Sequence, residues 1–278
     1  MNAAVVGHIE WVEFARVPHV PRVGEVVNAT ETWDEAAGGG AVTAVALARL
    51  AGRATLFTAL GDDELGRRAQ RRLERLGVVV HAAARDEPTR RAVTFVDDGG
   101  ERTITTIGDR LAPRGSDPLP WELLADHDCV YFTAGDPAAL AAARRARVLV
   151  MTPRARVVPP DGVRLDALVF SAGDPSETRS AVDLVELADV VVATEGELGG
   201  GWTSAARAGR WEAASIPGPI VDSYGCGDSF AAGLTYGLGA GFTLPDALGL
   251  GARCGAACLT GRGPYSGHLA GPRTTDGP

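Results

Sequence analysis

The second half of the chain alternates short apolar runs with longer stretches of helical spacing, and this alternation limits the folds open to it. Apolar runs occur at 129–133, 148–151, 167–170 and 190–193, and residues 137–147 between two of them have the composition of a helix. A further helix is expected after residue 170, running through Leu187. Parallel strands joined by helices are buried on both faces, so they read as continuous apolar runs. The pattern predicts an α/β fold, with a mostly parallel central sheet covered by helices in a three-layer sandwich.

The first half contains strands of a second kind. Residues 91–96 and 101–107 are β-branched runs joined by Asp97-Asp98-Gly99-Gly100, a pattern typical of a β-hairpin. Residues 8–32 include prolines and an alternating stretch at 25–30, which favours further strands away from the main core. No repeat or linker divides the chain, so we expect a single domain over residues 1–278.

Composition excludes several classes of function. The net charge is -8, which disfavours nucleic-acid binding because that requires a basic face. All 27 basic residues are arginine, so a phosphate-loop lysine and a Schiff-base lysine are both excluded. Neither an apolar run of about 18 residues nor a signal-peptide pattern is present. We therefore expect no membrane contact and a cytoplasmic location.

A glycine turn followed by a carboxylate is the strongest candidate for a functional site. Gly225-Cys226-Gly227-Asp228 follows an apolar pair and opens a run of helical spacing. Main-chain amides at such a helix start can converge on an anion, with the positive end of the helix dipole behind them. A carboxylate beside an anion site suits removal of a proton from an attacking hydroxyl. The alternative is a plain turn with Asp228 as the helix cap.

The segment 222–228, Asp-Ser-Tyr-Gly-Cys-Gly-Asp, resembles the Asp-Thr-x-Gly-Ala-Gly-Asp signature of the ribokinase (PfkB) family of carbohydrate kinases. Gly38-Gly39 and the helix after them resemble another family signature, and 61–66 resembles the family's Gly-Asp-Asp-x-x-Gly. Thr194-Glu195-Gly196 resembles a Thr-x-Gly that contacts the nucleotide. The resemblance implies a ribokinase-like sandwich with a small β-sheet lid, built from about 9–36 and 89–108.

The implied reaction is transfer of the γ-phosphoryl group of ATP to a hydroxymethyl group of a sugar or sugar-like substrate. Asp228 would be the general base, and the amides of Gly225, Cys226 and Gly227 would form the anion hole. The residues implied to contact the nucleotide are Thr194, Gly196, Asp222, Gly225 and Gly227. Mg²⁺ is expected near Asp174 or Glu177, where the family's Asn-x-x-Glu is poorly matched, and K⁺ near Asp222 is a further candidate.

The resemblance does not identify the phosphate acceptor. Gly38, Gly39, Glu10 and Arg102, with Asp228, are candidates for contact with it, and Arg110 is an alternative to Arg102. Val42 stands where the family has a sugar-contacting Asn, and Val12 where it has an Asp. Two alternatives therefore remain, a non-catalytic sugar or nucleoside sensor and a nucleoside kinase. The family also suggests a homodimer through the lid.

Overall fold

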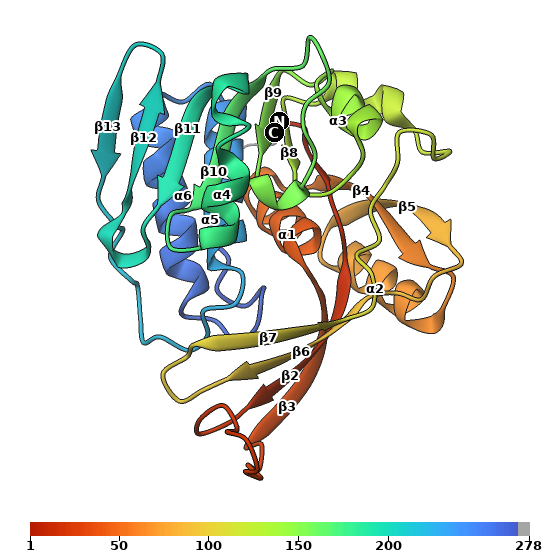
Figure 1. The fold of residues 1–278 in the computed structure, drawn as a ribbon, viewed down its shortest axis with the longest axis vertical. Coiled ribbons are helices and arrows are strands. Elements are labelled where there is room, and N and C mark those ends of the chain that lie inside the picture. The colour runs from red at the N-terminus through yellow and green to blue at the C-terminus, as the bar shows by residue number, and fades with distance from the viewer. Residues whose placement is uncertain (272–278) are drawn as a thin grey trace, which may run out of the picture.

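The computed structural model describes residues 1–271, and its core is a nine-stranded sheet within them. The strands are β1 (Ala3–Val6), β4 (Ala54–Gly61), β5 (Val78–Arg85), β8 (Cys129–Phe132), β9 (Val148–Met151), β10 (Leu165–Ser171), β11 (Ala188–Thr194), β12 (Gly200–Ser204) and β13 (Ala208–Trp211). Their order is β13-β12-β11-β10-β9-β8-β1-β4-β5 (Figure 1). Neighbours from β11 to β5 are parallel, while β12 and β13 pair antiparallel. The predicted α/β class is confirmed.

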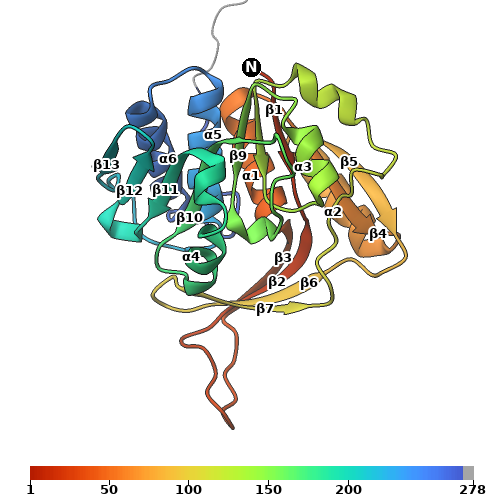
Figure 2. The same ribbon diagram turned by 45° about the horizontal axis from the view of Figure 1, so that its top comes forward.

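Helices cover both faces of this sheet (Figures 1 and 2). One side carries α1 (Gly39–Ala51), α2 (Glu64–Arg75), α5 (Cys226–Gly239) and α6 (Leu244–Cys258), and the other carries α3 (Pro137–Ala143) and α4 (Pro175–Ala181). Alternate residues of β1 point to opposite sides: Val5 belongs to the apolar cluster under α1 and α5, whereas Val6 belongs to the cluster under α3. No helix in residues 1–271 has both the length and the apolar character needed to cross a membrane.

A second, four-stranded sheet lies across one end of the molecule (Figure 1). Its strands are β2 (Glu10–Arg16), β3 (Glu31–Ala37), β6 (Arg91–Val96) and β7 (Arg102–Ile107), in the order β3-β2-β6-β7. The predicted hairpin is confirmed, since β6 and β7 pair antiparallel. Because β1 runs almost directly into β2, and β3 into α1, this sheet is attached at the carboxyl end of the central strand β1.

Two local predictions are wrong. Residues 25–30 form no strand; they belong to a loop that projects from the small sheet (Figure 2), where no neighbouring strand is available to pair with them. Val26 within this loop is 91% exposed, so its alternation with polar residues does not reflect burial. The helix expected to run through Leu187 ends at Ala181, because the chain turns there and buries Leu184 in the core.

Close contact between α5 and α6 depends on glycine. A Cβ on Gly233 of α5 would lie 2.8 Å from the Cα of Gly251, and a Cβ on Gly251 would lie 2.9 Å from the carbonyl oxygen of Phe230. Neither contact leaves room for a methyl group. Gly249, two residues away on α6, meets only the end of the Arg253 side chain, at 3.5 Å.

The pair Gly251→Ala and Gly249→Ala tests this packing. We expect Gly251→Ala to destabilise the protein by about 1–3 kcal/mol, since the helices must separate. Gly249→Ala is expected to be neutral or to stabilise by about 0.5–1 kcal/mol, because alanine favours a helix interior. Urea denaturation of both variants measures this difference, and equal stabilities would contradict the packing described.

Candidate functional site

The turn that begins α5 is fixed by Gly225. Its φ of 83° lies in the left-handed region, and a Cβ there would lie 2.9 Å from Cγ1 of Val42. The first main-chain hydrogen bond of the helix runs from the Ser229 amide to the Gly225 carbonyl oxygen, at 2.8 Å. The amides of Cys226 and Gly227 precede that bond and have no acceptor inside the helix, so they are free to bind an anion.

The carboxylate of Asp222 fixes this turn through hydrogen bonds to main-chain amides. One carboxylate oxygen accepts from the Tyr224 amide at 2.8 Å, and the other from the Gly263 amide at 2.9 Å. The side chain is fully buried, and burial raises the pKa of its carboxyl, while these two hydrogen bonds act in the opposite direction. In this arrangement Asp222 joins the turn to the segment after α6, and its carboxylate faces main chain rather than open space.

Asp228 lies in the first turn of α5 with its carboxylate beside α1. A Cβ on Gly39 would lie 3.2 Å from Asp228 Oδ1 and 3.1 Å from the Thr133 hydroxyl, so glycine at 39 allows these elements to approach. Burial raises the pKa of the Asp228 carboxyl; Arg154 and His8 oppose this increase through their charge, and Glu177 adds to it. No described residue donates a hydrogen bond to this carboxylate, which leaves it available as a proton acceptor.

Two adjoining cavities meet at Asp228. The first, about 330 Å³, lies between the small sheet and the carboxyl ends of the central strands, and the second, about 860 Å³, lies along β10 and β11. Gly225, Asp228, Arg102 and Arg154 line both. Such a location beyond the carboxyl ends of parallel strands is where ligands bind in open α/β sheets.

The predicted acceptor residues Glu10, Gly38 and Gly39 line the first cavity, together with Arg102 and Arg110. Glu10 is 5% exposed, 3.1 Å from Arg90 and 3.4 Å from His8. Burial raises its pKa, but the hydrogen bond from His8 and the nearby arginines outweigh this effect and hold the pKa below its usual value.

Val42 and Val12, the two departures from the family pattern, are both fully buried and therefore face no cavity. Val42 packs beneath the Gly225 turn, as the close approach of its Cγ1 shows. Any polar contact with an acceptor must consequently come from other side chains of the first cavity.

The predicted nucleotide residues Thr194 and Gly196 line the second cavity with Gly225 and Gly227. Thr194 ends β11, and its hydroxyl donates to the Phe170 carbonyl oxygen at 3.3 Å. Gly196 follows in a short 3₁₀ helix (Gly196–Leu198) with a φ of 62°, which favours glycine.

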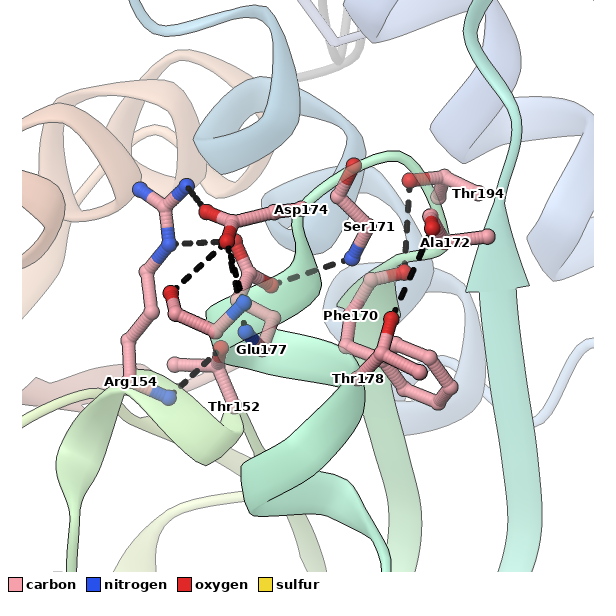
Figure 3. A network of polar contacts seen from close by, with 10 residues as sticks. Thr152, Arg154, Phe170, Ser171, Ala172, Asp174, Glu177, Thr178 and Thr194 are labelled. Atoms are coloured by element: carbon pink, nitrogen blue, oxygen red, sulfur yellow. Dashed lines mark hydrogen bonds and ion pairs between the residues drawn. The ribbon is translucent and has the colours of Figure 1, made fainter.

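Asp174 and Glu177, the residues predicted to hold magnesium, are paired with an arginine (Figure 3). Arg154 donates to Glu177, and its Nη2 lies 3.4 Å from Asp174 Oδ2. The second Glu177 oxygen accepts from the Ser171 amide at 3.0 Å. Among residues 1–271, no group of three or more His, Cys, Asp or Glu side chains is arranged to hold a metal ion. As arranged, these carboxylates do not fit a directly bound magnesium ion.

Sequence reasoning missed His8, Arg90, Arg154 and Arg156, all of which line the first cavity. Arg154 and Arg156 lie just after the predicted strand 148–151, and the position after a strand end was the signal available for them. His8 follows the end of β1 and carried the same signal, whereas Arg90 carried none, since the folding of the small sheet over the central sheet brings it into place.

The model of the pfkB family of carbohydrate kinases matches residues 2–149 and 151–269. Fructoselysine 6-kinase of Escherichia coli (strain K12) is 34% identical over 105 residues, which are 36% of this chain and 39% of that protein. The match thus spans about two fifths of the length of that relative.

Solved structures extend the likeness to nearly the whole chain. A ribokinase from Cryptococcus neoformans in complex with ADP has a TM-score of 0.73 and 25% identity, covering 97% of each chain. Adenosine kinase from Sinorhizobium meliloti has a TM-score of 0.74 and 20% identity, covering 95% of each chain, which shows the shared fold.

Removing the Asp222 carboxylate tests its structural role. We expect Asp222→Ala to destabilise the protein by roughly 2–4 kcal/mol, because the Tyr224 and Gly263 amides lose their buried acceptor. Asp161→Ala, at an exposed turn, is the matched control and is expected to change stability by less than about 0.5 kcal/mol. Denaturant unfolding of the two variants gives the comparison, and a small effect at Asp222 would contradict this assignment.

Proposed function

This chain belongs to the pfkB family of carbohydrate kinases, and on that premise we propose that it transfers the γ-phosphoryl group of ATP to a hydroxymethyl group of a sugar or sugar-like acceptor. The observation that carries the proposal is the position of Asp228, beside the Gly225 turn where two cavities meet. A transfer between two bound molecules needs such a shared boundary, with a proton acceptor on one side and an anion site on the other.

In the proposed reaction Asp228 accepts the proton of the acceptor hydroxyl. The hydroxyl oxygen then bonds to the γ-phosphorus while the bond to the β-phosphate oxygen breaks and ADP leaves. The amides of Gly225, Cys226 and Gly227 donate hydrogen bonds to the transferring group, and each well-placed donor is worth about 3 kcal/mol of barrier reduction. ATP binds along Thr194 and Gly196 in the second cavity, and the use of an adenine nucleotide is supported by the ADP complex of the Cryptococcus neoformans ribokinase.

Arg154 supplies a fixed positive charge at the boundary of the two cavities. Its guanidinium group pairs with Glu177 and Asp174. Burial raises the pKa of Asp228, and the positive charge of Arg154 lowers it. We assign it two roles: it favours the ionised form of the base, and it offsets the charge that builds up on the phosphoryl group. Magnesium, when bound with ATP, would neutralise phosphate charge, but no step here depends on protein ligands for it.

Replacement of the base tests the chemistry directly. We expect Asp228→Asn to lower kcat by about 10²–10⁴-fold, because the amide cannot accept the proton, while ATP affinity stays within about threefold of wild type. ADP release with a panel of sugars and nucleosides measures turnover, and calorimetry measures ATP binding.

Asp183→Asn, a similar change at an exposed position, is the control and should behave as wild type. Full turnover in Asp228→Asn would remove the proposed base. If instead the wild-type protein binds a member of the panel and ATP without producing ADP, the chain is a sensor rather than a kinase, and a nucleoside as the only acceptor would identify a nucleoside kinase.

The role of Arg154 predicts a change in pH dependence. Because its charge lowers the pKa of Asp228, Arg154→Gln should raise that pKa further. The base works only when ionised, so the fall of kcat on acidification should begin at a higher pH in Arg154→Gln than in wild type. Arg154→Lys retains the charge and should restore much of the wild-type profile. An identical acid limb in all three proteins would exclude this electrostatic role.

A further inference from the structure

The first cavity is unusually rich in arginine. Its walls include five, namely Arg90, Arg102, Arg110, Arg154 and Arg156. The whole chain has a net charge of -8, so general composition does not account for this concentration of positive charge. The walls also carry the carboxylates of Glu10, Asp174, Glu177 and Asp228, so the pairing of each arginine decides where an anion is attracted.

Three of the five arginines pair with carboxylates and two do not; Arg102 lies 3.9 Å from Glu101. Arg90 pairs with Glu10 at 3.1 Å, and Arg154 pairs with Glu177 and Asp174. Among the described residues, neither Arg110 nor Arg156 forms an ion pair. The two guanidinium amines of Arg110 donate to the carbonyl oxygens of Arg154 and Ala155, at 2.7 and 3.4 Å.

Arg110 therefore carries its charge among other cations. Burial lowers its pKa, and the like charges of Arg156, Arg90 and Arg154 lower it further, while the nearby Glu10 acts in the opposite direction. Arg110 is half-buried and Arg156 is exposed, so an anion that enters the cavity between them would offset the repulsion that Arg110 experiences.

The backbone at Arg156 points to the same conclusion. Arg156 has φ 56° and ψ 38°, and within residues 1–271 it is the one residue other than glycine with a positive φ. This conformation costs an L-residue roughly 1–2 kcal/mol, and glycine would relieve the cost. It follows the short 3₁₀ helix Pro153–Ala155, whose carbonyl oxygens Arg110 supports, so both guanidinium groups are positioned by one turn.

The location of these two arginines separates them from the phosphoryl donor. Of these two cavities, Arg110 and Arg156 line only the first, whereas Arg102 and Arg154 also line the second, where ATP is proposed to bind. An anion held by Arg110 and Arg156 is thus a part of the acceptor and not a phosphate of ATP.

We propose that the acceptor carries an anionic group, a phosphate or a carboxylate, which Arg110 and Arg156 bind while its hydroxymethyl group faces Asp228. This inference rests on the proposed kinase function. A guanidinium group is well suited to either anion, because its planar donors match two oxygen atoms at once.

Binding and turnover with matched acceptors test the proposal. Fructose is the neutral probe, fructose 1-phosphate and fructose 6-phosphate are the phosphate probes, and gluconate is the carboxylate probe; each has a free hydroxymethyl group. We expect at least one anionic probe to bind 10-fold or more tightly than fructose, with an affinity that falls as salt is added. Comparison of the phosphate probes with the carboxylate probe identifies which anion the site prefers.

Variants of Arg110 and Arg156 test whether these two residues cause the preference for an anionic acceptor. Arg156→Gly removes the guanidinium and relaxes the backbone, so it should fold with undiminished thermal stability, yet bind the preferred anionic probe about 10- to 100-fold more weakly. Arg110→Met should weaken the same probe to a similar extent, mainly through KM. Neither variant should alter the binding of fructose, and Arg75→Met on the outer side of α2 should leave all affinities unchanged.

Calorimetry separates failure of this inference from failure of the proposed function. Binding of an anionic probe that depends on Arg110 and Arg156, without any ADP release, would support the anion site and reject the kinase. Efficient phosphorylation of fructose with no preference for any anionic probe would overturn the anion site and keep the kinase. If no anionic probe binds, or if both variants bind it as well as wild type, the anion site is rejected.

Discussion

The left-handed turn at Gly225 is the constraint on which the rest of the site depends. It aims the amides of Cys226 and Gly227 away from the helix body, and it places Asp228 beside Gly39 of α1. The turn is secured from both sides, by Val42 beneath it and by the buried Asp222 carboxylate between Tyr224 and Gly263. The turn begins α5, and α5 packs closely against α6. The geometry of the site therefore depends on the packing of these two helices in the core.

Positive charge in the site is supplied locally by an otherwise acidic chain. The amides of the turn contribute partial charges that need no counter-ion, and Arg154, paired with Glu177 and Asp174, places a guanidinium group near Asp228. Where the family resemblance implied a metal bound by carboxylates, an arginine side chain lies between those carboxylates. In the proposed reaction, electrostatic stabilisation would come from groups already fixed by folding, which need no rearrangement when charge develops.

The sequence was a good guide to features that arise within one segment. The parallel strands, the hairpin at 91–107 and the Gly225 turn with Asp228 all follow from local patterns, and the structure contains each of them. Features that depend on distant segments were harder to predict. Arg90, Arg154 and Arg156 meet only because the small sheet folds over the carboxyl ends of β8 and β9. The projecting loop before β3 shows the opposite error, a strand-like pattern with no partner strand.

The arginine-lined cavity has a chemical consequence that follows from the lack of lysine. A guanidinium group keeps its proton through any pH at which the protein folds, so the wall of this cavity cannot lose charge in alkaline solution. It also presents no side-chain amine that could condense with the open-chain aldehyde or ketone of a reducing sugar. If the acceptor is a reducing sugar, as proposed, the cations that line this cavity do not form imines with it.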